Sequence, residues 1–463
     1  MEKNTKDSRS PSFVSPFDEV PVEILENILS FYPDGVIKGR RGTVHLGVIS
    51  SVCKKWQAVA TNIPEFWACF EVTISPAFSY PSPPILNMWL ERSGFAPLSF
   101  SLTMKNFNYQ ISSLLGNLPE LLCDLLLREV HRWRNVAFTF PEVDPDNSLF
   151  PPNLEAPFLK SLEVYCHSSW STIPARDILW LSSLASNAPS LQRFTAHGAE
   201  QFRDLPVPWE RLTHLYLQQS ISEQDARDIL ERSPCLFSCN LIDTGVRLGG
   251  QSSLFSSPEM ITCNSEELGV CTRGDLGRFF SVLDAPNIKS LEVVFVNCSA
   301  TWDISMLPKF LSGSRASEIT NLSIRNCLLS NEQLLTCLRS VSLSLTDLNI
   351  LSDNLSAREY IKVENVDETV LRALTHNSDS SSVLCPRLRN ITFERCLSES
   401  DDGILSDMVE SRWKKKTIQE LRSVTVVFRY HTHPVDAVRL RKMITEGLGG
   451  EVRFGPPQIF RHL

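Results

Sequence analysis

The sequence predicts an α/β protein in which a small N-terminal helical module precedes a long array of strand–turn–helix units. Three observations favour this fold class. Two short amphipathic helical patterns lie within residues 17–70, a short apolar phrase recurs throughout the rest of the chain, and polar helix-starting segments follow several copies of that phrase. Each of these elements has a local physical reason.

Length, hydrophobic content and net charge limit which classes of protein this chain can belong to. The chain has 463 residues, of which 42% are hydrophobic and 21% charged, so it can bury a large core and wholesale disorder is excluded. Its formal net charge is −8, and no global basic excess is available to hold a phosphate backbone. We therefore expect no nucleic-acid partner.

Cysteine usage and apolar run lengths predict the compartment. The 13 cysteines are odd in number and irregularly spaced, which argues against a disulfide framework. Residues 1–12 are polar and lack the apolar core of a signal peptide, and the longest apolar runs are too short to span a bilayer. We expect a cytoplasmic or nuclear protein without a membrane partner.

The N-terminal module combines two helical patterns with a closing aromatic pair. Residues 1–16 predict a disordered tail, after which residues 21–31 form an amphipathic pattern with Pro21 in its first turn. A second helix is predicted from about His45 to Thr61, and Phe66 and Trp67 close the module. Two short helices cannot bury their apolar faces alone, so the module either caps the following domain or completes its core on a partner.

These residues resemble the F-box family. The resemblance covers residues 17–70 and rests on Pro21-x-Glu-Ile-Leu, Ile28-Leu29, Val52-Cys-x-x-Trp56 and Pro64-x-x-Trp67. It implies a three-helix F-box that binds a Skp-type adaptor and so joins cullin and RING subunits in a Skp–cullin–F-box ubiquitin ligase. The residues expected to bind the adaptor are Pro21, Ile24, Leu25, Ile28, Leu29, Val52, Trp56 and Trp67.

Residues 71–135 are interpreted as a linker and capping segment. The order of a Trp-Leu-Glu-Arg-Ser-Gly stretch ending at Gly94, a Pro-Leu-Ser at Pro97 and an Arg-Trp at Trp133 resembles fungal F-box proteins with irregular leucine-rich repeats. The basic cluster at Arg132–Arg134 favours a solvated start of a strand over a nucleic-acid site, because the chain is acidic and few aromatic residues accompany the cluster.

From residue 136 to residue 463 we predict a leucine-rich-repeat-like domain. The recurring phrase places apolar residues at three positions, as in Leu159-Leu162-Val164, and its last positions suit a short strand with alternate side chains inward. Two copies extend to a cysteine, Cys327 and Cys396, where the chain is expected to turn and the cysteine side chain to sit in the interior. Stacked strands of this kind would form an α/β horseshoe with a concave strand face.

Polar helix starts and one insertion complete the predicted array. Ser222, Ser330 and Ser398 are each expected to cap a helix that follows a strand. Residues 351–384 are rich in Ser, Asp and Asn and predict an inserted loop around a helix near Val366–Thr375. The alternative is an ordinary α/β domain in which the leucine spacing is fortuitous.

Motifs of catalysis are missing from the sequence. We find no G-x-S-x-G, H-E-x-x-H, strand-following G-x-G-x-x-G or C-x-x-C, so we expect neither an enzyme nor a cofactor. His431 and His433 would share one face of a strand, but no acid pair or cysteine stands near them in the sequence, and no metal site is expected.

Binding to a protein is the chemistry that the repeats favour. One position in each repeat is expected to face the concave side, and the resulting row is mixed and mostly polar, with neither a basic stripe nor an aromatic ladder. It consists of Glu163, Thr195, Tyr216, Asn240, Glu292, Ser323, Asn349, Thr392 and Thr425. His214 and Tyr216 are the candidate target-binding residues, because aromatic side chains dominate many interfaces.

The resemblance and the repeats together predict a non-catalytic substrate receptor. The F-box would bind the Skp-type adaptor, and the repeats would hold an unidentified target protein for ubiquitin-dependent degradation. The alternative is a leucine-rich-repeat interaction scaffold whose F-box-like helices are only a structural cap.

Overall fold

The structure is a computed structural model, and it describes most of the chain with gaps between the described segments. The described residues are 20–30, 49–75, 79–105, 118–140, 150–166, 179–198, 205–221, 223–244, 260–272, 277–295, 306–313, 318–326, 329–352, 366–376, 383–397, 402–413, 420–429 and 433–455. The chain divides into two compact units, Met1–Ser168 with Thr172–Leu191, and Ser169–Ser171 with Gln192–Leu463. The predicted boundaries at residues 70 and 135 both lie inside the first unit.

The first unit begins with three short helices around a small apolar core. They are α1 (Val22–Ser30), α3 (Lys54–Asn62) and α4 (Pro64–Trp67). The core of this region consists of Leu25, Leu29, Ile49, Val59, Ala60, Ile63 and Phe66, with Val20 and Trp56 packed against it. The predicted tail at residues 1–16 lies outside the described residues.

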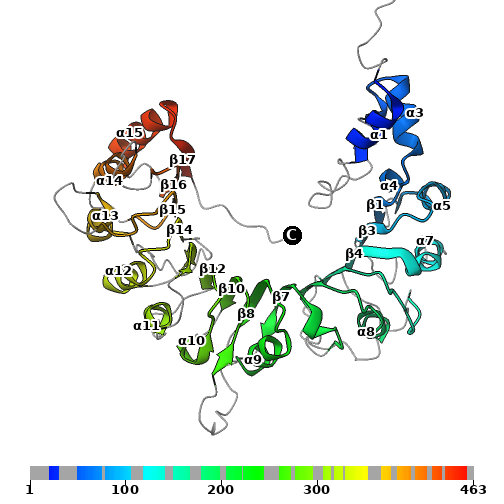
Figure 1. Cartoon of the computed structure of the whole chain (residues 1–463), viewed down its shortest axis with the longest axis horizontal. Helices are drawn as coiled ribbons and strands as arrows, with labels where there is room; N and C mark the ends of the chain where they lie inside the picture. Colours follow the sequence, from blue (N-terminus) through cyan, green and yellow to red (C-terminus); the bar gives the residue numbers. More distant parts are fainter. Residues whose placement is uncertain are drawn as a thin grey trace, which may run out of the picture. The chain divides into compact units, whose positions relative to one another are not determined.

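A five-stranded sheet follows in the first unit, in the order β5-β4-β3-β1-β2. Its strands alternate buried and half-buried residues, and helices cover the buried side (Figure 1). All neighbouring strands are parallel except β1 and β2. The elements are β1 (Cys69–Ile74), β2 (Ser79–Tyr80), α5 (Pro83–Arg92), β3 (Leu98–Met104), α7 (Leu118–Arg128), the 3₁₀ turn η3 (Val130–Arg132), β4 (Trp133–Phe140), β5 (Ser161–Cys166) and α8 (Leu179–Ser186).

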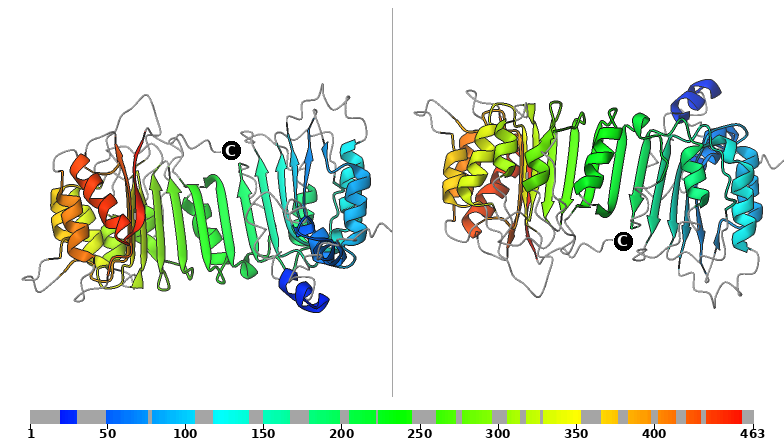
Figure 2. Two further views of the ribbon diagram at one scale, coloured as in Figure 1. Left: turned by 90° about the horizontal axis from the view of Figure 1, so that it is seen from above. Right: turned by 90° about the horizontal axis from the view of Figure 1, so that it is seen from below.

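The second unit contributes ten parallel strands, in the order β17-β16-β15-β14-β13-β12-β10-β8-β7-β6. The described helices of this unit lie on one side of the strands, and none of them covers the other side (Figures 1 and 2). A separate two-stranded pair, β9 with β11, lies beside helix α9 in the same unit.

The elements of the second unit alternate between strand and helix. They are β6 (Arg193–His197), η6 (Trp209–Arg211), β7 (His214–Ile221), α9 (Glu223–Arg232), β8 (Ser238–Thr244), β9 (Ile261–Thr262), β10 (Glu267–Thr272), α10 (Gly277–Val282), β11 (Leu283–Asp284), β12 (Ser290–Phe295), α11 (Met306–Gly313), β13 (Asn321–Arg325), α12 (Asn331–Ser340), β14 (Asp347–Leu351), α13 (Glu368–Leu374), β15 (Asn390–Glu394), α14 (Ile404–Arg412), β16 (Ser423–Arg429), α15 (Pro434–Thr445) and β17 (Gly449–Gly455). Most of the predicted insertion at residues 351–384 lies outside the described residues.

Local sequence signals account for the caps and turns of this unit. Ser330 caps α12 as predicted: its hydroxyl accepts a hydrogen bond from the amide of Gln333, and the Gln333 side chain accepts one from the Ser330 amide. Cys396 is fully buried after β15 and its thiol donates to the carbonyl of Ile350 over 3.2 Å. Cys327, Ser222 and Ser398 lie outside the described residues.

This architecture corrects the predicted fold class. The prediction was a three-helix F-box followed by a leucine-rich-repeat horseshoe, whereas the described chain has a large, mostly parallel sheet of fifteen strands with thirteen short α-helices. The first strand already starts at Cys69, where Phe70, Val72 and Ile74 alternate with half-buried residues. The strands thus begin far ahead of residue 136, and α1 is only nine residues long.

Candidate interaction surfaces

Helix α1 divides its apolar residues between core and surface. Leu25 and Leu29 are 1% and 3% exposed, whereas Ile24 and Ile28 are 50% and 56% exposed. Each pair is one helical turn apart, so the helix has a packed row and, beside it, an uncovered apolar row. Pro21 precedes the helix in an exposed position, and its carbonyl accepts the amide of Leu25. Half of the predicted adaptor-binding residues on this helix are therefore accessible to a partner.

The start of α3 adds a further exposed apolar residue. The predicted continuous helix from His45 to Thr61 is wrong, because Cys53 is extended and caps α3 through a contact of its sulfur with the amide of Trp56 over 3.5 Å. The turn ahead of Cys53 leaves Val52 53% exposed, while Trp56 packs partly against the small core.

Trp67 belongs to the interior of the first unit. Its side chain is 7% exposed, and its indole N–H donates to the carbonyl of Thr61 over 2.9 Å. The guanidinium of Arg92, at the end of α5, lies 4.6 Å from the ring centroid. Trp67 thus joins the helices to the sheet and is not available to a partner without rearrangement.

The uncovered side of the second unit carries one continuous polar row. The predicted row position is in register from strand to strand, from Thr195 through Tyr216 to Asn240 and onward. In chain order the row is Thr195, Tyr216, Asn240, Gly269, Glu292, Ser323, Asn349, Thr392, Thr425 and Glu451. We call the side of the sheet that carries this row the open face. Glu163 holds the equivalent place in the first unit, opposite Ala137.

The two predicted target-binding residues, His214 and Tyr216, occupy alternate positions of β7 and so lie on the same face of the strand. The ring of Tyr216 lies 4.9 Å from the ring of His197 on β6, and the ring of His214 lies 5.8 Å from that of Phe237. His214 also makes a 2.9 Å hydrogen bond through Nδ1 with the hydroxyl of Thr213. Aromatic rings therefore gather at this part of the open face.

Burial shifts the pKa values of the three titratable rings at this part of the open face, those of His197, His214 and Tyr216. It lowers the pKa of His214, an effect that the charge of Arg193 increases and that of Glu267 opposes. Burial also lowers the pKa of His197, against a hydrogen bond with Gln218. Both imidazoles are therefore neutral at pH 7. The pKa of the Tyr216 phenol is raised by burial, then by the charges of Cys271 and Glu292.

Sequence reasoning missed strand β10 and with it two positions of the open face. Glu267 and Gly269 lie in residues 244–285, which match the repeat phrase poorly. Only the alternation of Leu268 and Val270 marks the strand in the sequence, and both are buried. That pair is too short a signal to separate from chance.

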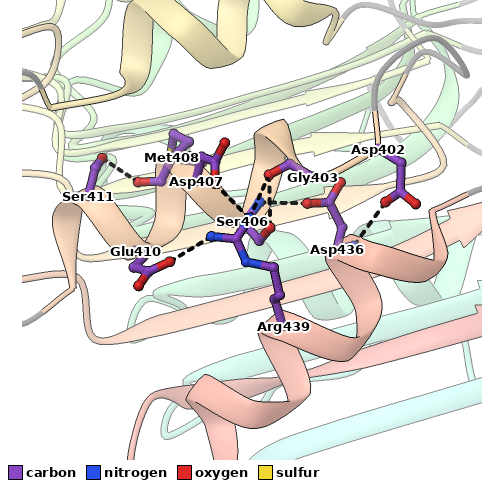
Figure 3. Close-up of polar contacts among 9 residues, drawn as sticks. All are labelled: Asp402, Gly403, Ser406, Asp407, Met408, Glu410, Ser411, Asp436 and Arg439. Carbon is purple, nitrogen blue, oxygen red and sulfur yellow. Dashed lines mark hydrogen bonds and ion pairs between the residues drawn. The ribbon is translucent and has the colours of Figure 1, made fainter.

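A group of two carboxylates and an imidazole joins the last two helices. One oxygen of Asp402 accepts the amide of Val435 over 2.9 Å. The other accepts the amide of Asp436 over 2.9 Å, and Asp436 accepts the amide of Ser406 over 2.7 Å (Figure 3). Nδ1 of His433 lies 3.5 Å from the second Asp436 oxygen. The ligand atoms of Asp402, His433 and Asp436 lie within 4.8 Å of one another. Reciprocal capping of α14 and α15 accounts for this grouping. The predicted partner histidine, His431, lies outside the described residues.

The basic cluster at residues 132–134 is split by the fold. Arg132 is buried rather than solvated, and it donates to the carbonyl of Leu90 in the last turn of α5 over 3.1 Å and to that of Ala96, beyond the helix, over 2.9 Å. It also contacts Glu129 over 2.7 Å. Arg134 is exposed. Arg132 thus ties a carbonyl in the last turn of α5 to the segment that follows the helix.

No protein-family model matches the sequence, and none of the curated proteins compared with it matches. Within the described residues, no helix has the length and apolar character needed to cross a bilayer.

Proposed function

We propose that this chain is a non-catalytic substrate receptor of a Skp–cullin–F-box ubiquitin ligase. Helices α1 and α3 bind the Skp-type adaptor, which connects the chain to the cullin and RING subunits. The open face of the second unit holds the target protein. Ubiquitin transfer is then promoted by proximity, because target lysines are kept at high effective concentration near the transfer centre.

The observation that carries this proposal is the uncovered apolar row of α1. Ile24 and Ile28 stay about half exposed on a helix whose neighbouring row, Leu25 and Leu29, is packed into a core. An amphipathic helix that presents branched residues one turn apart is the feature by which helices dock into apolar grooves. These isoleucines belong to the stretch that resembles the F-box motif.

The scaffold alternative, in which these helices only cap the sheet, has one observation in its favour. Trp67 is buried where α4 meets the sheet, with Arg92 against its ring, so part of the helical region is integral to the first unit. A role as a cap does not explain why Ile24 and Ile28 form an exposed apolar row on α1.

Co-elution with a Skp-type adaptor on size-exclusion chromatography tests the proposal. The wild-type chain is expected to co-elute, and the Ile24→Asp, Ile28→Asp variant is expected to bind roughly a hundredfold more weakly, because two exposed apolar contacts become charged. Val438→Asp is the matched control, since Val438 is 67% exposed on α15 in the second unit. Its binding is expected to equal that of the wild type.

Two outcomes would contradict the proposal. If folded wild-type chain does not bind the adaptor, the helices serve as a cap. If the α1 variant binds as tightly as the Val438→Asp control, the adaptor does not contact the uncovered row of α1.

A further inference from the structure

Three side chains that can ligate a metal ion meet where helices α14 and α15 begin. Asp402 precedes α14, His433 precedes α15, and Asp436 lies in the first turn of α15. One ligand atom of each residue lies within 4.8 Å of those of the other two. Imidazole nitrogen and carboxylate oxygen are ligands that zinc takes in proteins, so these three residues have the chemistry of a zinc site.

Capping of the two helices explains only part of this group. The two oxygens of Asp402 accept the amides of Val435 and Asp436, and one oxygen of Asp436 accepts the amide of Ser406. The other oxygen of Asp436 is fully buried, and within the described part of the chain it accepts no hydrogen bond of normal geometry. A buried carboxylate oxygen left in this way is costly, so it points to a cation that capping does not supply.

The distance between this oxygen and the imidazole suits two ligands of one metal ion. Nδ1 of His433 lies 3.5 Å from it, longer than the usual hydrogen-bond range of about 2.7–3.2 Å. Two ligand atoms that each lie about 2.0 Å from a tetrahedral zinc ion are about 3.3 Å apart. The His433 ring is almost completely buried and stacks on Phe428 with a centroid distance of 5.1 Å, which fixes its orientation.

Charge and access are also those of a cation site. Among the described residues, no lysine or arginine forms an ion pair with Asp402 or Asp436. Arg439, on the same helix as Asp436, instead bonds to Asp407 and Glu410 over 2.6 Å each (Figure 3). The backbone amides that bond to the two aspartates orient the carboxylates, as outer partners of metal ligands do. Asp402 is exposed, so water can complete the coordination from this side.

We propose that Asp402, His433 and Asp436 bind a divalent transition-metal ion that clamps the starts of α14 and α15 together. We name these three residues the zinc site, because an imidazole ligand favours zinc over calcium or magnesium, which take oxygen ligands. The proposal goes beyond the proposed function and does not depend on it, since adaptor binding involves α1 and α3 in the other unit.

Isothermal titration calorimetry with zinc chloride on the metal-free full chain tests the site. Asp402→Asn is expected to weaken zinc binding roughly tenfold or more, because a charged ligand is lost. Asp407→Asn is the matched control: Asp407 is also exposed on α14 and loses the same charge, but it lies outside the zinc site, and binding is expected to equal that of the wild type. Zinc held by exposed thiols such as Cys235 is common to all these proteins and cancels in the comparison.

Thermal denaturation with and without zinc gives a second readout. A ligand that binds only the folded state raises the thermal midpoint, so zinc is expected to stabilise the wild type and Asp407→Asn more than Asp402→Asn or Asp436→Asn. If Asp436→Asn does not fold, Asp402→Asn still decides the question, because Asp402 is exposed. Equal zinc affinity and equal stabilisation of the wild type and Asp402→Asn would overturn the proposal and leave a capping contact alone.

Discussion

The N-terminal helices and the open face of the second unit both leave surface uncovered, but they do so with opposite chemistry. On α1 the uncovered row is apolar, Ile24 and Ile28, beside a core of few residues. On the open face the uncovered row is polar, and the alternate positions, such as Leu215 and Leu217, are fully buried. The helices suit a buried apolar interface, whereas the sheet suits a polar interface that selects by hydrogen bonds and charge.

A substitution in the packed row of α1 is expected to reduce stability most, and one in the uncovered row hardly at all. Leu25→Ala is expected to destabilise the helical region by about 3 kcal/mol, because it removes a fully buried side chain from a small core. Ile28→Ala is expected to change stability by less than about 0.5 kcal/mol, since the side chain is half exposed. Hydrogen exchange of α1 and α3 amides measures both, and equal effects would contradict the division into packed and uncovered rows.

Arg412, a fully buried arginine of the second unit, is expected to give the next largest effect on stability. Arg412 is fully buried, and it donates to the carbonyls of Leu374, Leu384 and Cys385. Burial lowers its pKa to about 10, partly offset by Cys385. Arg412→Met is expected to destabilise the unit by about 2 kcal/mol, because it leaves buried carbonyls without donors.

Arg439→Met is the control for this change. Arg439 bonds to Asp407 and Glu410 over 2.6 Å each, but it is 35% exposed. Its loss is expected to cost less than about 1 kcal/mol. Thermal denaturation of both variants measures the difference, and a larger loss for Arg439→Met would contradict the role given to Arg412.

Asp436, which links the starts of α14 and α15, is expected to give the smallest loss of stability, and that loss depends on pH. Burial alone would raise the pKa of Asp436, but hydrogen bonds from His433, Ser406 and Gly403 outweigh it and lower the pKa. A carboxylate with a lowered folded pKa stabilises the fold above its unfolded pKa of about 3.9 and loses that contribution as pH falls through the folded pKa. Asp436→Asn is expected to cost about 1.5 kcal/mol at pH 7.

The cost of Asp436→Asn is expected to shrink below about pH 4, when the wild-type carboxyl takes up its proton. Urea unfolding of wild type and variant at pH 7, 4 and 3 measures this dependence. A difference that stays constant down to pH 3 would show that the charge of Asp436 does not contribute to the link between the two helices.

Sequence patterns predicted single elements better than their assembly. Strands such as 161–166 and the row from Thr195 to Thr425 were predicted, because period-two alternation is a local property. The fold class was wrong because the strands already begin at Cys69, inside residues interpreted as a helical module. On α1 the periodicity identified the four apolar residues Ile24, Leu25, Ile28 and Leu29, but it could not tell which two are packed, since that depends on α3.

The candidate surfaces were likewise only partly predictable. His214 and Tyr216 were chosen for their aromatic rings, whereas the places of Glu267 and Gly269 on the open face follow from the register of β10, which lies two strands away from β7. Gly269 matters through the side chain of Asn240 on the adjacent strand, which no local pattern indicates. The clustering of Asp402 with Asp436 likewise arises from the packing of two helices.

Hydrogen–deuterium exchange of the full chain with and without a Skp-type adaptor tests the central claim most directly. The account predicts slower exchange on adaptor binding at residues 22–30 and 54–62, and unchanged exchange in β6 to β17. Protection of the open-face strands with none in α1, or no protection anywhere despite folded protein, would contradict the assignment of the adaptor to the uncovered row of α1.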